Sequence, residues 1–450
     1  MEKPNNPITE VKAHYERYPY PLRDPASERQ RLFEITLDKL ELINFYGFKG
    51  RQNFDNHFRV LVAGGGTGDS TLYLAEQLRD KHAEIIYVDL STASMHIAQE
   101  RAKVRKLNNI QWYQCSLLEL PQRHLGQFDY INCGGVLHYL DEQYNQALLA
   151  TLKSLLKPEG CMGIMVYGQY GRTGVYQMQK LMQLINAKET EMPAKVENTQ
   201  AVLQELPATN WFKRAEELFA VDIQFGDIGL YDLFLHSQDR AYTVLELHDL
   251  LEHCGLYFVD YVSQRRILYN PATFIKNQKI LTLIQQYDQK QQQAIAELIG
   301  GNIQKHLFYA ANQPNTIARL DDLDNVPFLS STIQVNIADL IGKQPGQVVT
   351  LFQPNGINVE FQPRHYTQAI FSHLDGHNSL KEIFAQVRHD FQDDTLLDHT
   401  LLEDFRPIYQ AFNYLDLMLL RHKTISRFKT TTELQENAFK KAPIRIKKKS

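Results

Sequence analysis

The chain has 450 residues, a length that suits two or three domains with cores of their own, and its formal net charge of -4 argues against a general affinity for nucleic acid. The sequence starts without the apolar core of a signal peptide, no apolar run approaches membrane-spanning length, and the 4 cysteines contain no Cys-x-x-Cys pair. We therefore expect a cytoplasmic protein with no membrane partner, no disulfide framework and no bound metal.

Residues 1–57 are predicted to form an arm and a helix that act as a lid for the domain that follows. Tyr15 and Tyr20 lie in an aromatic segment in which two prolines impose an extended exit from a first short helix. These tyrosines either close over a ligand or pack on the neighbouring domain. Apolar residues at helical spacing then predict an amphipathic helix over 28–45, which ends at Gly47.

From residue 58 onward, apolar strand patterns alternate with helical patterns. Strands are predicted at 59–63, 84–89, 110–114, 128–133 and 161–167. Helices are predicted between them at 70–78, 93–107 and 146–156. This alternation predicts an α/β fold with a parallel, doubly wound, Rossmann-like sheet, whose ligand crevice lies at the carboxyl ends of the strands.

A further helix is expected at 176–185, followed by an irregular insertion over about 187–235. The alternation then resumes with a helix at 245–254 and a strand at 255–262. The first domain is therefore predicted to span residues 58–270 and to include the insertion.

The remainder of the chain is predicted to form a smaller unit. A helical connector and linker are expected over 271–330, an α+β domain with a winged-helix-like mixture of elements over 331–430, and a basic tail over 431–450. Within this unit we expect strands at 331–337 and 357–361 and helices at 366–374, 379–391 and 401–420. The helix at 379–391 carries Ser379 as its cap, with Glu382 completing a capping box.

A glycine-rich turn separates the first strand from the first helix of the sheet. Gly64, Gly66 and Gly68 are spaced G-x-G-x-G, whereas a dinucleotide fingerprint reads G-x-G-x-x-G. Asp69 stands where the third glycine of that fingerprint falls, and its carboxylate would repel a pyrophosphate. The turn therefore favours a nucleoside with a zwitterionic amino-acid tail over NAD or FAD. Asp69 either faces the ammonium group of that ligand or complements the dipole of the following helix.

Asp89 ends the second predicted strand, about twenty residues beyond the turn, where a carboxylate can accept hydrogen bonds from both hydroxyls of a ribose. Together with the glycine turn and the segments 117–121 and 128–140, it makes residues 58–170 resemble class I S-adenosylmethionine-dependent methyltransferases. The arm Tyr15–Pro21, of YExYPYP type, and the AGGGTGD loop resemble more narrowly a bacterial subgroup of that family.

The resemblance implies an enzyme that transfers a methyl group from S-adenosyl-L-methionine, by in-line displacement, to an unidentified oxygen or nitrogen acceptor. It assigns the cofactor contacts to Gly64, Gly65, Gly66, Gly68, Asp69, Asp89, Leu90, Ser116, Leu117 and Gly134. Two positions depart from the family pattern, since its usual acid before the loop is Val62 here and the acid that reads the adenine falls on Ser116. These departures motivate the alternative of a non-catalytic, regulatory protein that binds S-adenosylmethionine.

His138 follows the fourth predicted strand and is the candidate catalytic residue, as a general base if the acceptor carries a proton. The alternative is a structural histidine. The candidates for the substrate pocket are Tyr15, Tyr20, Tyr167, Arg172, His236 and Arg240, which could instead serve packing or tie the insertion to the sheet. We expect the acceptor to be a small molecule or a protein, with nucleic acid disfavoured.

Overall fold

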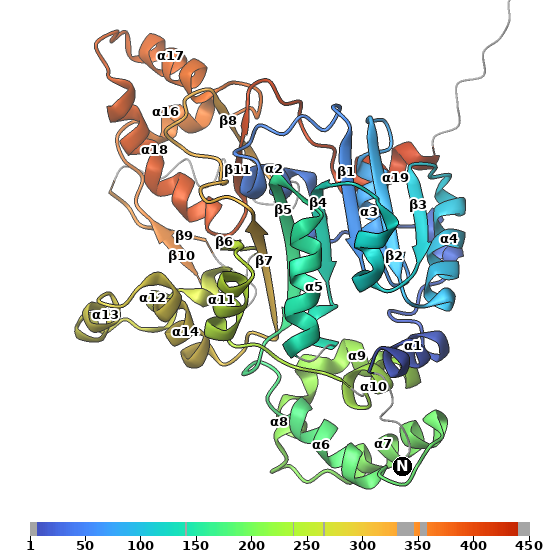
Figure 1. The fold of residues 1–450 in the computed structure, drawn as a ribbon. Helices are drawn as coiled ribbons and strands as arrows, with labels where there is room; N and C mark the ends of the chain where they lie inside the picture. Colours follow the sequence, from blue (N-terminus) through green and yellow to red (C-terminus); the bar gives the residue numbers. More distant parts are fainter. Residues whose placement is uncertain are drawn as a thin grey trace, which may run out of the picture.

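The structure, a computed structural model, describes residues 7–139, 142–236, 238–263, 266–330, 346–351 and 358–439. Figure 1 shows a central sheet with helices around it. The N-terminal helix α1 (Pro7–Arg17) and the helices of the insertion gather at one end, and helices α16 to α18 of the C-terminal part lie at the other end.

Seven strands form one sheet in the order β3-β2-β1-β4-β5-β7-β6. Their bounds are β1 Phe58–Ala63, β2 Ala83–Asp89, β3 Ile110–Gln114, β4 Phe128–Gly134, β5 Leu156–Tyr167, β6 Tyr257–Tyr261 and β7 Lys305–Ala311. Neighbours among β1 to β5 are parallel, whereas β7 is antiparallel to both β5 and β6. The predicted Rossmann-like fold is confirmed, and its strand order reverses between β1 and β4, which is where such sheets bind ligands.

The middle of the sheet is buried on both faces, so the apolar run of its strand β1 is continuous and does not alternate. Val60, Leu61 and Val62 of β1 are 0% exposed. The helices α3 (Asp69–Gln77) and α4 (Thr92–Arg105) follow β1 and β2, and α5 (Glu142–Ser154) precedes β5. Helix α2 (Leu40–Gly47) packs on β5 and β7, while α11 (Val244–His253) packs on β6.

Strand β7 corrects the predicted boundary of the first domain. Residues 272–312 were expected to be helical, and they do contain α12 (Pro271–Phe274), α13 (Gln278–Ile284) and α14 (Gln289–Gly300). The last stretch, however, pairs with β5 and β6 along its length. The sheet therefore continues to Ala311, beyond the expected end at residue 270, because pairing with distant strands overrides the local helical pattern.

The insertion over 187–235 is helical, whereas we expected it to be irregular. It consists of α7 (Met192–Glu205), α8 (Trp211–Ala215), η5 (Glu216–Phe219), α9 (Ala220–Gln224) and α10 (Asp227–Phe234). Together with α6 (Val175–Ile185) these helices bury a small core of their own, which includes Met178, Met182, Phe212 and Phe234. Most of them are too short to show helical periodicity in the sequence, which explains the wrong prediction.

The helix predicted over 28–45 is also interrupted. The structure has the 3-10 turns η1 (Pro25–Arg29) and η2 (Thr36–Asp38) before α2 begins. The carboxylate of Glu28 is tied to α4 by buried ion pairs, while α2 is held by its packing on the sheet. The chain therefore runs in a non-helical path between these two attachments.

The C-terminal part also differs from its prediction at two strands. β8 (Asn325–Leu329), expected to be linker, pairs antiparallel with β11 (Met418–His422), expected to be the end of a helix. The other elements are β9 (Val349–Leu351), β10 (Val359–Phe361), α16 (Thr367–Ser372), α17 (Leu380–Phe391), α18 (Asp398–Asn413) and α19 (Thr431–Phe439), and the capping box of Ser379 and Glu382 is present. The strand expected at 331–337 lies outside the described residues. No helix in the described ranges is long and apolar enough to span a membrane.

Candidate active site

The carboxyl ends of four adjacent strands form one edge of the sheet, and every predicted cofactor residue lies along it. Ala63, the last residue of β1, is fully buried, whereas Gly64 and Gly66 just beyond it are half-buried. The same change occurs after the buried parts of β2 and β4, at Asp89, Leu90 and Gly134, and Ser116 and Leu117 beyond β3 are half-buried as well. A row of accessible positions thus follows a row of buried ones at this edge.

The glycine turn adopts a shape that side chains would obstruct. Gly64 has a φ of +78°, and a Cβ added there would lie 2.3 Å from Cγ2 of Val136. The carbonyl of Gly66 accepts a hydrogen bond of 2.7 Å from the hydroxyl of Tyr87, whose ring fills the space beside Gly65. The turn is therefore held in a conformation that keeps its backbone open to a ligand.

Asp89 joins the end of β2 to the glycine turn. Its Oδ2 accepts a hydrogen bond of 2.7 Å from the amide of Gly66, and its Oδ1 accepts one of 2.8 Å from the amide of Ser91. Burial raises the pKa of this carboxyl group, while the backbone hydrogen bonds act in the opposite sense. No ion pair of Asp89 with a cation occurs among the described residues, so the carboxylate can serve as an acceptor for the hydroxyls of a ribose.

We expect Asp89→Asn to weaken the binding of S-adenosylhomocysteine about tenfold to a hundredfold, because an amide is a weaker acceptor for two hydroxyls than a carboxylate is. Isothermal titration calorimetry of the full chain measures this change. Asp80→Asn, on a side chain that is 68% exposed, is the matched control and should leave the affinity unchanged. Equal affinities for the wild type and Asp89→Asn would remove Asp89 from the binding site.

The carboxylate of Asp69 is bound by side chains of the protein. This differs from the first of its two predicted roles, a contact with the ammonium group of the ligand. Arg23 donates to Asp69 through Nε at 3.0 Å and through Nη2 at 2.7 Å, and Arg101 donates through Nη1 at 2.7 Å. These guanidinium groups hold the pKa of its carboxyl group below the usual range, although burial acts in the opposite direction. Asp69 therefore anchors the N-terminal arm to the glycine turn, as the first residue of α3.

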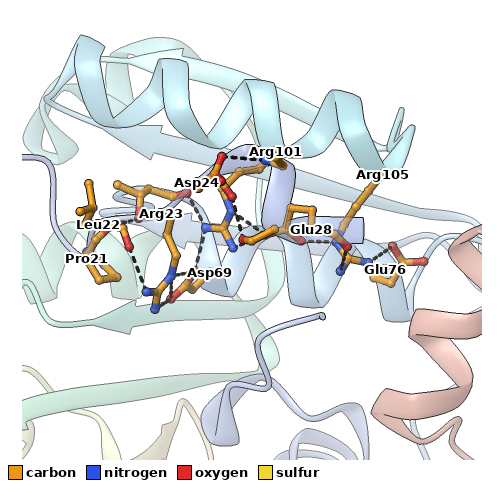
Figure 2. A network of polar contacts seen from close by, with 12 residues as sticks. Pro21, Leu22, Arg23, Asp24, Glu28, Asp69, Glu76, Arg101 and Arg105 are labelled. Atoms are coloured by element: carbon orange, nitrogen blue, oxygen red, sulfur yellow. Dashed lines mark hydrogen bonds and ion pairs between the residues drawn. The ribbon is translucent and has the colours of Figure 1, made fainter. Parts of the chain in front are cut away.

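Figure 2 shows the wider set of buried ion pairs to which Asp69 belongs, which we call the ion-pair latch and define as Arg23, Glu28, Asp69, Arg101 and Arg105. Arg101 contacts Glu28 through Nη2 at 2.6 Å and donates to the carbonyl of Thr67, within the glycine turn, at 2.7 Å. Arg105 binds the other oxygen of Glu28. The side chains of Glu28, Arg101 and Arg105 are at most 1% exposed, so the latch connects the arm, α4 and the turn inside the protein.

The N-terminal arm, residues 7–29, lies across the edge of the sheet that carries the predicted cofactor residues, which we call the cofactor edge. The hydroxyl of Thr67 donates to the carbonyl of Pro21 at 2.8 Å, and the carbonyl of Tyr20 lies over Gly66. Farther along the edge, the carboxylate of Glu16 accepts the amides of Thr92 and Ala93 at the N-terminus of α4, at 2.6 and 3.1 Å. The arm thus lies against this edge, and its role as a lid stays a prediction.

A buried group of aromatic and polar side chains lies beyond the ends of β4 and β5, and we call it the acceptor cluster. It consists of His14, Tyr15, His138, Tyr139, Tyr167, Arg172, Asp232, His236 and Asp239. The arm contributes the first two, the strand ends contribute the next three, the segment after β5 contributes Arg172, and the insertion and the segment after it contribute Asp232, His236 and Asp239. Five of the predicted residues therefore meet in one place, namely Tyr15, His138, Tyr167, Arg172 and His236.

Several polar atoms of the acceptor cluster are buried without a hydrogen-bond partner in the described part of the chain. They are both ring nitrogens of His14 and of His138, Nε2 of His236, Nη2 of Arg172 and Oδ1 of Asp239. Burial lowers the pKa of all three histidines, so each ring is neutral at neutral pH. Since buried polar groups are normally satisfied, this concentration of unsatisfied atoms is typical of a binding site.

Two predicted pocket residues point elsewhere. The hydroxyl of Tyr20 donates to Asp222 of α9 at 2.9 Å, so Tyr20 fastens the arm to the insertion. The guanidinium of Arg240 is 34% exposed and pairs with Glu246 at 3.3 Å, although the amide of Arg240 donates to the carbonyl of His138.

Six residues of the site have no functional signature in the sequence that we recognised, namely Arg23, Glu28, Arg101 and Arg105 of the latch and His14 and Asp232 of the cluster. For Arg101 and Arg105 a signal existed, because they lie four residues apart on the helix face that also carries Ala98 and Ala102. Two arginines on an apolar face indicate a buried acid nearby. No pattern in the sequence, however, identifies Glu28 as that acid.

Comparisons with known proteins agree with this geometry. Residues 61–162 match a family model described as a methyltransferase domain. An uncharacterised protein of Synechococcus is 32% identical over 260 residues, which make up 57% of this chain and 60% of that protein. The ubiquinone biosynthesis O-methyltransferase of Acinetobacter baylyi is 26% identical over 139 residues, 30% of this chain and 53% of that enzyme. The chain thus covers between half and two thirds of the length of these two relatives.

Among solved structures, PKMT2 from Rickettsia typhi in complex with AdoHcy is similar in fold, with a TM-score of 0.58 and 16% identity over 90% of this chain and 76% of that one. Residues 61–162 are thus similar to a methyltransferase domain, and the strand order and the likeness to the solved structure give this part of the chain a Rossmann-like methyltransferase fold.

Proposed function

We propose that the chain is an enzyme that transfers a methyl group from S-adenosylmethionine to an oxygen or nitrogen atom of an acceptor bound at the acceptor cluster. The observation that carries this proposal is the position of the cluster. Tyr139 and Tyr167 follow β4 and β5, directly beside the point between β1 and β4 where the strand order reverses. Unsatisfied polar atoms therefore adjoin the edge that holds the cofactor residues.

S-adenosylmethionine, when bound, supplies an electrophilic methyl group on a sulfonium. The chain must then align an acceptor with that group and keep water away, which provides much of the rate of such a transfer. The arm serves both needs, because it covers the glycine turn through Pro21 and brings Tyr15 into the acceptor cluster. We infer that the arm closes after the cofactor has bound.

The cofactor contacts follow the arrangement of the edge. We propose that Asp89 accepts the ribose hydroxyls, that Leu117 packs on the adenine and Ser116 hydrogen-bonds it, and that the amides of the glycine turn bind the carboxylate of the methionine part. The hydroxyl of Ser116 already accepts the amide of Leu118 at 3.3 Å, as the cap of a short 3-10 helix, so it is a modest adenine ligand. The contribution of Asp69 is to anchor the arm.

His138 is better suited to shaping the site than to general-base catalysis. Its ring is 0% exposed and lies 3.9 Å, between centroids, from the ring of Tyr167. Burial, together with the nearby charge of Arg172, lowers the pKa of this histidine well below its usual value. A group that holds a proton so weakly is a poor base at neutral pH.

The formation of S-adenosylhomocysteine in the presence of a cell lysate tests the proposal. We expect the full chain to convert S-adenosylmethionine only when both the lysate and the intact protein are present, and Asp89→Asn to be slower at limiting cofactor. Binding of the cofactor without any lysate-dependent conversion would instead support the regulatory, non-catalytic alternative that Val62 and Ser116 suggested. The cytoplasmic location and the bacterial subgroup indicated by the arm remain part of this proposal.

A further inference from the structure

Asp232 is a buried carboxyl group whose hydrogen-bond donors are hydroxyl groups and not cations. Its Oδ1 accepts the hydroxyl of Tyr15 at 3.2 Å and that of Tyr139 at 3.3 Å, and the residue is 5% exposed. No ion pair of Asp232 occurs among the described residues. Burying a carboxylate without a cationic partner is unfavourable in free energy, and a cationic ligand would offset this unfavourable term.

Arg172 does not supply the missing charge, because it is engaged by another acid. Its Nη2 lies 3.5 Å from Oδ2 of Asp239, and its guanidinium stacks on the ring of Tyr167 at 3.7 Å. With the histidines neutral, Arg172 and Asp239 balance each other. Two further charges adjoin the cluster and have opposite signs, Lys305, whose Nζ lies 5.9 Å from the centroid of the Tyr167 ring, and Asp222, so the charge of Asp232 is left over. The cluster therefore has one negative charge in excess whenever Asp232 is ionised.

Three tyrosine rings surround this carboxylate. The ring of Tyr139 makes edge contacts with Tyr15 and with Tyr167, at centroid distances of 6.0 and 6.3 Å. The hydroxyls of Tyr139 and Tyr167 lie 3.4 Å apart, so the polar ends of the rings converge beside Asp232. A buried carboxylate ringed by tyrosine hydroxyls offers an ammonium ion an opposite charge and hydroxyl oxygens that can accept its N–H groups.

We propose that the methyl acceptor is an amine, which binds as its ammonium ion to Asp232 within the cage of Tyr15, Tyr139 and Tyr167. This inference rests on the proposed function and narrows it, since it selects nitrogen over oxygen as the acceptor atom. Tyr15 belongs to the arm, so the cage is complete only when the arm covers the cofactor edge.

The chemistry of an amine acceptor assigns a second task to Asp232. An ammonium nitrogen has no lone pair, so it must first lose a proton, which passes to the carboxylate of Asp232. The free amine nitrogen then forms a bond to the methyl carbon while the bond from that carbon to sulfur breaks, and its electron pair stays on sulfur. The products are the N-methylammonium ion, S-adenosylhomocysteine and the proton that Asp232 returns to water.

Burial raises the pKa of Asp232 to about 7, against its usual value of 3.8. This makes Asp232 a stronger base than an ordinary carboxylate and places its titration near neutral pH. The charged and titratable groups that face it are Tyr15 of α1, Tyr20 of the arm, Tyr139 of η4 (Leu137–Tyr139), Tyr167 of β5, and Arg172, Asp222 and Asp239.

Three small probes of similar shape and different charge test the proposal on the full chain saturated with S-adenosylhomocysteine. They are n-butylammonium, n-butanol and n-butyrate, and their binding is followed by NMR titration. We expect n-butylammonium to bind at least about tenfold more tightly than n-butanol, and Asp232→Asn to abolish that preference. Asp227→Asn makes the same change on an exposed side chain of the same helix and should preserve the preference.

Each other outcome has a clear meaning. Tighter binding of n-butyrate than of n-butylammonium would assign ligand recognition to Arg172 and would overturn the proposal of an amine acceptor. Equal binding of all three probes, or of none, by protein that does bind S-adenosylhomocysteine would overturn it as well, with the proposed methyl transfer left intact. Failure of the wild type to bind S-adenosylhomocysteine at all would contradict the proposed function itself.

The affinity for n-butylammonium should also depend on pH. Because the pKa of Asp232 is raised to about 7, the carboxyl group is mostly neutral at pH 6 and mostly anionic at pH 8, while the probe stays positively charged throughout. We therefore expect binding to strengthen up to about tenfold between pH 6 and pH 8, and to be insensitive to pH in Asp232→Asn. Weaker binding at the higher pH would contradict the role of Asp232.

Discussion

Replacing Gly66 with arginine should reduce the affinity for S-adenosylhomocysteine at least about a hundredfold. Gly66 lies at the centre of the glycine turn, with its amide bonded to Asp89, and a Cβ added there would lie 3.4 Å from the carbonyl of Tyr20. An arginine side chain would therefore fill the space between the turn and the arm, which the cofactor must enter. Isothermal titration calorimetry of the folded variant measures the loss.

Gly301→Arg provides the control for backbone strain. Gly66 and Gly301 have φ angles of +51° and +63°, so both substitutions place an arginine in the left-handed region at a similar cost. Nothing lies within 4 Å of a Cβ at Gly301, which ends α14 away from the cofactor edge. Gly301→Arg should bind S-adenosylhomocysteine as the wild type does. Loss of affinity in both variants would mean that strain, and not obstruction of the turn, explains the effect.

Replacing Glu28 with glutamine should lower the free energy of unfolding by about 3 kcal/mol. Both oxygens of Glu28 are bound by guanidinium groups, of Arg101 and Arg105, and all three side chains are buried. Removing the negative charge leaves two buried cations with too little compensation, which is the costly way to break a buried network. Urea denaturation followed by circular dichroism measures the shift of the first unfolding transition.

Glu100→Gln makes the same chemical change on α4 itself, at a side chain that is 38% exposed and paired with the exposed Lys103. Pairs of this kind contribute little, so we expect no measurable shift of the transition. If Glu28→Gln proved as stable as Glu100→Gln, the latch would not stabilise the fold. A loss of stability together with weaker binding of S-adenosylhomocysteine would show that the latch also holds the arm over the glycine turn.

The sequence was a good guide wherever local pattern and long-range structure agree. Strands β1, β2 and β5 have apolar runs that are typical of a buried parallel sheet. The ends of β1 to β5 fall within a few residues of the prediction, except that β5 begins at Leu156 and not at 161. The glycine turn and Asp89 were found because their spacing follows from the geometry of that sheet. From these features the cofactor edge can be located in the sequence without any knowledge of tertiary contacts.

The rest depended on partners far away in the chain. Asp69 lies in the first turn of α3, as the helix-dipole alternative predicted, but its partners Arg23 and Arg101 are 46 and 32 residues distant and could not be foreseen. β7 is a strand because it pairs with β5 and β6. Asp232 lies in an insertion whose short helices gave no periodic signal, so its convergence with Tyr15 could not be foreseen. Local pattern contains no information on which distant side chains meet.

Mass spectrometry of methyl transfer tests the central claim most directly. The full chain is incubated with a cell lysate and S-adenosylmethionine that carries a trideuteromethyl group, with Gly66→Arg in parallel. We predict that the wild type alone transfers the trideuteromethyl group to a product, and that the group is attached to nitrogen. The absence of any trideuteromethylated product with the wild type, under conditions in which it binds S-adenosylhomocysteine, would contradict the account of this protein as a methyltransferase.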